Sequence, residues 1–225
     1  MKTSLTEIVF ILDRSGSMGS MVEPAISGFN RLLREQNQGP GQARFTLVLF
    51  DDQYEAPYHS VPIAEVVELD TSTFVPRGST ALLDAIGRTI DELGAKLAAT
   101  PEADRPGQVL VAILTDGEEN SSTRFTWLDV SKRIRHQSEK YGWQFLFLGA
   151  NQDAIATAGR MNIDAKHTAN FAMSGESYDA SKGALSRKMS AIRRRGQGES
   201  SADILHDAEA PLETMREEEE RRPKS

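Results

Sequence analysis

Residues 7–17 read EIVFILDRSGS, an apolar run that stops abruptly at Asp13 and gives way to polar residues. A short run that is apolar on both faces is typical of a strand buried in a parallel sheet. Asp13, Ser15 and Ser17 then stand at every second position, with a glycine between the two serines. Three oxygen side chains spaced in this way can turn toward one point. The segment therefore predicts a buried first strand followed by an oxygen-rich turn.

Outward from this segment, the chain alternates strand-like apolar runs with helical patterns. Further strands are expected at 44–50, 61–69, 109–114, 144–148 and 165–171, and helices at 22–33, 82–97, 126–139, 155–161 and 176–196. The runs at 61–69 and 165–171 are weak, and the first of them is expected at an edge of the sheet. The alternation predicts an α/β fold, a doubly wound and mostly parallel sheet with helices on both faces. In such folds the functional residues lie at the carboxyl ends of the strands.

Two further polar positions are expected on the same rim of the sheet. Thr80 opens the clearest helical stripe, within Arg77-Gly78-Ser79-Thr80, and Asp116 follows the strand expected at 109–114. Together with the first turn they supply two carboxylates and three hydroxyls, a hard-oxygen set that suits Mg²⁺ or Mn²⁺ rather than zinc or copper. Because Mg²⁺ takes six ligands, water or an outside oxygen must complete its coordination. An open position on such an ion favours an incoming carboxylate.

The three parts in this order resemble the metal-ion-dependent adhesion site (MIDAS) of von Willebrand factor A (vWA) domains. The residues that match the family's motif are Asp13, Ser15, Ser17, Thr80 and Asp116. The resemblance covers about residues 5 to 172, and Met18 is typical of the intracellular bacterial branch. It implies a six-stranded sheet with one antiparallel edge strand, and a protein-binding module whose Mg²⁺ (or Mn²⁺) is completed by an Asp or Glu of the partner. Bacterial relatives work beside ATPases or in stress and defence operons, so a partner of that kind is expected.

Composition places the chain among ordinary globular proteins. It has 225 residues, a formal net charge of −7 and no cysteine, so no nucleic-acid partner is expected, and disulfides and cysteine nucleophiles are excluded. The amino-terminal apolar run is too short for a signal peptide, and no stretch approaches the length of a membrane span. We expect a cytoplasmic protein with a vWA domain over 1–175, an additional helix over 176–196 and a disordered, charged tail over 197–225.

Two other functions remain open. A Mg²⁺-dependent phosphohydrolase of the haloacid-dehalogenase type would need a second aspartate where this chain has Ser15. No P-loop pattern occurs, and no histidine falls at a confidently placed strand end, so an enzyme is not expected. The other alternative is a vWA scaffold without metal-dependent binding. The presence of all five motif residues argues against it. For residues 13–17 taken alone, a helix-capping turn is the plain structural interpretation.

Several other charged residues are expected in solvent. Arg14 is expected to be exposed, where it could meet an acidic group of a partner. Asp51-Asp52 and Glu118-Glu119 are expected to be solvated turn residues; the alternative is that they lie just outside the metal ligands and tune the charge at the site. Arg193 to Arg195 are expected to be the solvated end of a helix; the alternative is a contact with a nucleic acid or an acidic partner.

Overall fold

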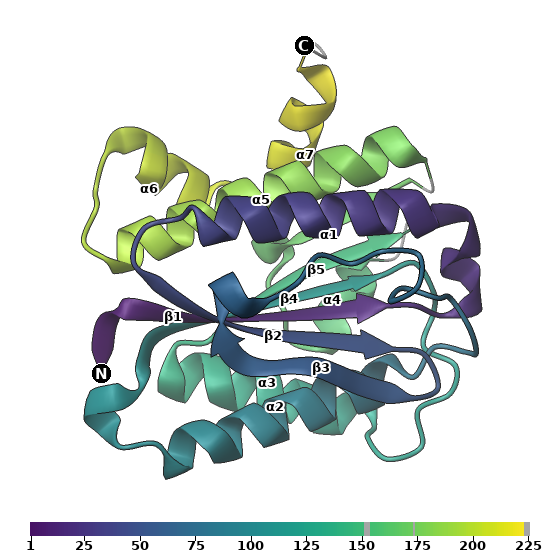
Figure 1. Ribbon diagram of the computed structural model, residues 1–225, viewed down its shortest axis with the longest axis horizontal. Helices are drawn as coiled ribbons and strands as arrows, with labels where there is room; N and C mark the ends of the chain where they lie inside the picture. The colour runs from purple at the N-terminus through teal and green to yellow at the C-terminus, as the bar shows by residue number, and fades with distance from the viewer. Residues whose placement is uncertain (151–153, 173, 223–225) are drawn as a thin grey trace.

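The computed structural model describes residues 1–150, 154–172 and 174–222, and within them a mixed sheet lies between layers of helices (Figure 1). Its six strands are β1 (Lys2–Asp13), β2 (Gln42–Phe50), β3 (Tyr54–Pro62), β4 (Pro106–Thr115), β5 (Gln144–Ala150) and β6 (Thr168–Phe171). They lie in the order β3-β2-β1-β4-β5-β6. The β2–β3 pair is antiparallel and the other neighbouring pairs are parallel. The expected doubly wound sheet with one antiparallel edge strand is confirmed.

Helices cover both faces of the sheet because the central strands are apolar on both sides. One face carries α1 (Val22–Asn37) and α5 (Gly175–Gly196), and the other carries α2 (Leu82–Ala99), α3 (Trp127–Tyr141) and the short α4 (Ala154–Arg160) (Figure 1). Along β1, Phe10 packs edge to face on Phe29 of α1, whereas Ile11 belongs to the cluster that contains Ile86 of α2. This layering leaves the carboxyl ends of the parallel strands as the rim where strand-to-helix turns gather.

The antiparallel edge strand lies earlier in the chain than the sequence predicts. The structure places β3 at Tyr54–Pro62, not at 61–69. An edge strand exposes part of its surface and tolerates Pro57, so this segment shows no apolar run. The apolar residues that follow pack against α1 instead, and Asn30 of α1 donates a hydrogen bond to the Leu69 carbonyl at 2.8 Å. Burial under a helix, rather than strand pairing, accounts for the run at 61–69.

The basic end of α5 is only partly solvated. Arg193 is buried, and its guanidinium donates to the carbonyl oxygens of Gln36 at 2.6 Å and Pro40 at 3.2 Å. Arg194 is exposed and pairs with Glu199. The expectation of a solvated helix end therefore holds for Arg194 and is wrong for Arg193, because α5 packs lengthwise on α1.

The carboxyl-terminal segment differs from its prediction as a disordered tail from residue 197. It forms α6 (Ala202–Glu209) and α7 (Leu212–Arg221), which pack against α5 (Figure 1). Leu212 and Met215 are fully buried, and Glu213 accepts a hydrogen bond from the Asn170 backbone N–H of β6 at 2.7 Å. The few apolar residues of this charged segment face the domain only once its helices form. The prediction of disorder is wrong for residues 202–221.

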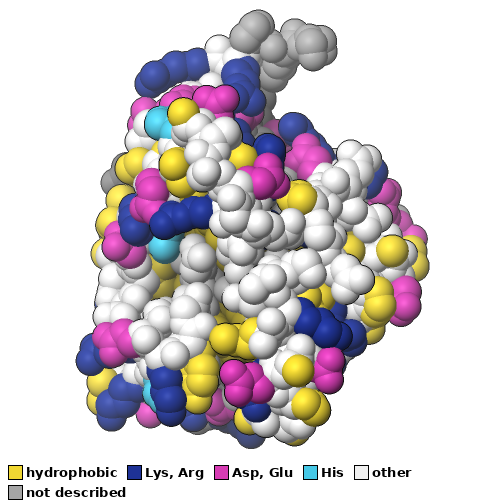
Figure 2. Space-filling view, turned by 90° about the vertical axis from the view of Figure 1, so that its left-hand side faces the viewer, with side chains coloured by type: hydrophobic (Ala, Val, Ile, Leu, Met, Phe, Trp, Pro, Cys, Tyr) yellow, Lys and Arg dark blue, Asp and Glu magenta, His cyan; other side chains and the backbone are white. Residues whose placement is uncertain are grey.

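The face of the molecule near the amino end of β1 is mixed in charge. Figure 2 shows the face near the amino end of β1, where basic and acidic side chains are interspersed. The whole chain carries 26 Lys and Arg against 33 Asp and Glu, so the excess charge is negative. Among the described residues, no helix is long and apolar enough to cross a membrane.

Candidate metal site

The ends of β1 and β4 lie side by side at the rim because these strands are parallel neighbours. Leu12 of β1 pairs with Leu114 of β4, so Asp13 and Asp116 leave the sheet at nearly the same level. Thr115, the last residue of β4, donates from its hydroxyl to Asp13 Oδ2 at 2.5 Å. Strand register therefore brings the two predicted carboxylates to one place.

The serine side chains close around these carboxylates. The Ser15 backbone N–H donates to Asp13 Oδ1 at 2.7 Å, which turns the chain back toward β1. The hydroxyl oxygens of Ser15 and Ser17 are 3.1 Å apart, and Ser17 donates to Asp116 Oδ1 at 2.8 Å. Ser17 links the loop after β1 to the loop after β4.

Thr80 reaches the same place from the loop before α2. Its Oγ1 would lie only 2.8 Å from a Cβ added at Gly117, so the glycine beside Asp116 leaves room for this hydroxyl. The Thr80 backbone N–H donates to Asn120 Oδ1 at 2.9 Å, and its carbonyl accepts from the Asn120 N–H at 3.0 Å. The structure thus gathers all five predicted residues, from three loops, at one point on the rim: Asp13, Ser15, Ser17, Thr80 and Asp116.

Both carboxylates are buried, which makes their charged forms unfavourable. Burial raises the pKa of Asp116 to about 6; the Ser17 hydrogen bond opposes this shift and the charge of Asp13 adds to it. Burial likewise raises the pKa of Asp13, against hydrogen bonds from Thr115 and Ser15. Asp116 Oδ2 is buried and has no hydrogen-bond partner among the described residues. A buried acceptor of this kind is costly unless another group satisfies it.

The Tyr178 hydroxyl is a second unsatisfied group in this region, and no sequence signal marks it. Tyr178 lies near the start of α5, with its ring 5.0 Å from that of Phe171 at the end of β6. Its hydroxyl is buried and, within the described parts of the chain, has no hydrogen-bond partner. Burial raises the pKa of Tyr178 well above its ordinary value, and the charges of Asp116 and Asp13 raise it further. An acceptor and a donor are therefore both left unsatisfied near the rim.

Glu119, expected as a solvated turn residue, is a structural residue instead. Its carboxylate accepts from the backbone N–H of Leu83 at 2.9 Å and from those of Ser121 and Ser122 at 3.0 and 2.7 Å. It therefore satisfies a free donor in the first turn of α2, the helix that Thr80 precedes. Glu118 is exposed, as expected.

Arg14 does not face solvent, and the expectation that it is exposed to a partner is wrong. It is buried, and it donates through Nε to Asp51 Oδ2 at 3.1 Å and through Nη1 to Glu55 Oε2 at 2.9 Å. Asp51, also expected in solvent, is completely buried. The pairing of β1 with β2 runs as far as Asp13 and Phe50, and this register places the residue after each of them side by side.

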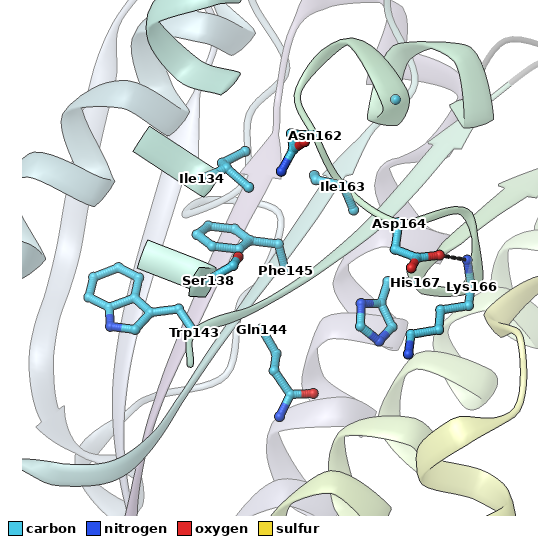
Figure 3. A pocket seen from close by; sticks show the side chains of 11 residues that line it. Ile134, Ser138, Trp143, Gln144, Phe145, Asn162, Ile163, Asp164, Lys166 and His167 are labelled. Carbon is cyan, nitrogen blue, oxygen red and sulfur yellow. Dashed lines mark hydrogen bonds between the residues drawn. The ribbon is translucent and has the colours of Figure 1, made fainter. Parts of the chain in front are cut away.

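A separate pocket lies at the other end of the sheet. Its volume is about 520 Å³, and it opens beside the first residues of β5, between α3 and the segment 159–167 (Figure 3). Ile134 and Phe145 line one side, and Lys166 and His167 line the other. Burial lowers the pKa of His167 to about 4, so its imidazole is neutral at physiological pH. The pocket shares no residue with the oxygen cluster at the rim.

Solved structures with a similar fold include vWA proteins. A von Willebrand factor type A protein from Catenulispora acidiphila matches with a TM-score of 0.51 and 16% identity, over 88% of this chain and 43% of its own. Proximal thread matrix protein 1 from the mussel byssus, with a zinc-occupied MIDAS motif, matches with a TM-score of 0.57 and 17% identity, over 82% and 46%. The manganese-loaded TRAP protein of Plasmodium vivax matches with a TM-score of 0.53 and 14% identity, over 76% and 70%. No family model matches the sequence, and the search of curated proteins found no match.

The chain therefore has the fold of vWA domains. It spans less than half the length of the Catenulispora and mussel chains, 43% and 46%, so the likeness concerns one part of those longer proteins. Because the sequence identities to these proteins are only 14 to 17%, the likeness shows the fold alone.

Proposed function

We propose that this chain is a metal-dependent protein-binding module of the MIDAS type. Its five oxygen residues, Asp13, Ser15, Ser17, Thr80 and Asp116, would hold a divalent cation, Mg²⁺ or Mn²⁺. An Asp or Glu side chain of a partner protein would complete the coordination. The observation that carries the proposal is the convergence of these side chains beside Asp116 Oδ2, a buried acceptor without a partner in the described part of the chain.

The chemistry of the donor set supports a hard cation. Two carboxylates balance the charge of a divalent ion, and hydroxyl oxygens are neutral hard ligands. Among the described residues, no three His, Cys, Asp or Glu side chains gather as a metal-binding group. The proposed site therefore depends on its hydroxyls and leaves part of the coordination to water or to a partner. Ser17 is exposed, so a carboxylate from outside can approach on that side.

Thermal unfolding tests the metal site. Mg²⁺ or Mn²⁺ should raise the melting temperature of the wild-type chain, because a ligand that binds only the folded state stabilises it, by about 2.7 kcal/mol at a hundred times its Kd. Asp13→Ala should lose this increase. Glu118→Ala, which removes an exposed carboxylate two residues from Asp116, should keep it. An increase in Asp13→Ala equal to that of wild type would place the metal elsewhere.

Partner capture tests the binding function. Proteins retained by the immobilised chain in Mg²⁺ should be released by EDTA and retained poorly by Asp13→Ala protein that remains folded. Added salt should weaken the complex only moderately, because a direct metal–carboxylate bond is screened less than exposed ion pairs. A partner that binds equally well in EDTA would contradict the proposal. Mg²⁺-dependent turnover of a phosphate ester would instead favour the phosphohydrolase alternative.

A further inference from the structure

Four charged side chains lie behind the rim and form a charge cluster: Arg14, Asp51, Glu55 and Arg77. Asp51 Oδ2 accepts from Arg77 Nε at 2.8 Å and from Arg14 Nε at 3.1 Å. Glu55 also accepts from both arginines, at 2.6 Å from Arg77 Nη2 and at 2.9 Å from Arg14 Nη1. Two positive and two negative charges balance one another, so the cluster leaves the charge of the oxygen site uncompensated.

The charge cluster is anchored in the interior at Asp51. The exposed fraction of the side chain is 0% for Asp51 and 5% for Arg14, against 43% for Arg77 and 48% for Glu55. The other Asp51 oxygen accepts from the Gln53 backbone N–H at 2.6 Å. Hydrogen bonds from Arg14 and Arg77 lower the pKa of Glu55 to about 2, so this carboxylate stays ionised at physiological pH. Charge-assisted bonds to a buried carboxylate fix geometry better than exposed ion pairs do.

The cluster joins two of the three loops that meet at the oxygen site. Arg14 lies inside the Asp-x-Ser-x-Ser turn, and its carbonyl accepts from the Arg77 backbone N–H at 2.9 Å. The Gly16 N–H donates to the Gly78 carbonyl at 3.1 Å. Gly78 has a φ of 64°, a backbone conformation that favours glycine, and a Cβ there would lie 2.2 Å from Asp52 Oδ1. The second loop is thus packed on the first through both backbone and side chain.

We propose that Arg77 and Asp51 are positioning residues for metal binding, because they hold the Thr80 loop against the first turn without contacting the ion. The inference rests on the proposed metal site and assigns part of its affinity to residues outside the donor set. Asn120 already holds Thr80 from the side of the third loop. Loss of the Arg77 side chain would remove the side-chain link between the two loops and leave the Thr80 loop held by backbone hydrogen bonds and by Asn120, so the Thr80 hydroxyl would be less well placed as a ligand.

A double-variant cycle on the full chain, with Mn²⁺ as the probe, tests this inference. Arg77→Met should weaken Mn²⁺ binding about ten-fold, within the range typical of residues that orient metal ligands. In a Thr80→Ala background the same change should cost less than about two-fold, because the group that it positions is gone. Arg133→Met is the matched control: this partly exposed arginine joins α3 to Asp91 of α2 and should leave Mn²⁺ affinity unchanged.

A second readout needs no metal. In EDTA, Arg77→Met should speed amide hydrogen exchange at Gly16 and Thr80 while the amides of β1 and β4 exchange as in wild type. Equal Mn²⁺ affinity of Arg77→Met and wild type would overturn the inference, and so would a full ten-fold loss in the Thr80→Ala background. A wild-type chain that binds no Mn²⁺ overturns the proposed function and the inference together. That result is distinguishable because it is seen before any substitution is made.

Discussion

At the scale of single residues, Asp116 combines burial with an unsatisfied oxygen. Burial raises its pKa from 3.8 to about 6 in the metal-free protein. For an acid whose folded pKa is raised, the contribution to stability is complete below the unfolded value and is lost as the pH rises through the folded value. The contribution of Asp116 to stability is therefore lost between about pH 4 and pH 6. At neutral pH the residue proposed to bind the ion weakens the metal-free fold.

Asp116→Asn should therefore stabilise the metal-free chain at neutral pH, by on the order of 2 kcal/mol, and the gain should disappear near pH 4. Mg²⁺ should then raise the melting temperature of wild type and not of the variant. Thermal unfolding in EDTA across this pH range, followed by addition of Mg²⁺, measures both effects. Glu118→Gln, at an exposed neighbour, should show neither. A variant less stable than wild type at neutral pH in EDTA would contradict this account.

At the scale of elements, a buried arginine holds α5 to the end of α1. Arg193 is 1% exposed and donates to the Gln36 backbone and side-chain oxygens at 2.6 and 3.0 Å and to the Pro40 carbonyl at 3.2 Å. These acceptors lie at the carboxyl end of α1, where helix carbonyls lack partners within the helix. The arginine thus satisfies the Gln36 side-chain oxygen and gives a charged donor to two carbonyls that also accept from the Gly39 N–H at 3.2 Å and from Gln197 Nε2 at 2.9 Å.

Arg193→Met should lower the free energy of unfolding by about 2 kcal/mol, because charge-assisted hydrogen bonds to buried carbonyls are lost. Arg194→Met, one residue further along, should change it by less than about 0.5 kcal/mol, since that side chain is exposed. Urea unfolding of the two variants beside wild type gives the comparison. Equal effects of the two substitutions on the free energy of unfolding would mean that the hydrogen bonds of Arg193 between α5 and α1 do not stabilise the fold.

At the scale of the whole molecule, α7 lies against the outer edge strand of the sheet, and α6 packs beside it on α5. An edge strand presents unpaired backbone groups that can pair with another chain. Here Glu213 of α7 accepts from the Asn170 N–H of β6, and Lys188 of α5 donates to the carbonyls of Ala208 in the last turn of α6 and of Ala210 just after it. The carboxyl-terminal segment is therefore part of the fold and protects β6.

Truncation after Gly196 should destabilise the chain by several kcal/mol, since burial of Leu212 and of Met215 contributes about 2 kcal/mol each. It should also promote self-association through the uncovered β6. Thermal unfolding and light scattering measure the two effects, and removal of only the residues after 222 is the control. A truncated chain with the melting temperature of wild type would restore the interpretation of this segment as a dispensable tail.

The sequence by itself determined the layered α/β fold and which residues would meet at the rim. Asp13, Thr80 and Asp116 each stand where an apolar run ends or a helical stripe begins. Such ends are visible locally, because strand and helix periodicities are carried by neighbouring residues. In a doubly wound sheet they gather at one edge, so the five oxygen residues could be placed together without coordinates.

Only the tertiary structure decided which of the remaining charged and apolar residues are buried. Arg14 and Arg193 look like surface residues in the sequence, and each is buried because a partner distant in the chain, Asp51 or the end of α1, lies opposite. The edge strand β3 and the helix α7 were misjudged for the related reason that their burial depends on what packs against them. Periodicity is a property of neighbouring residues, whereas the partner of a buried charge is set by how elements distant in sequence pack together.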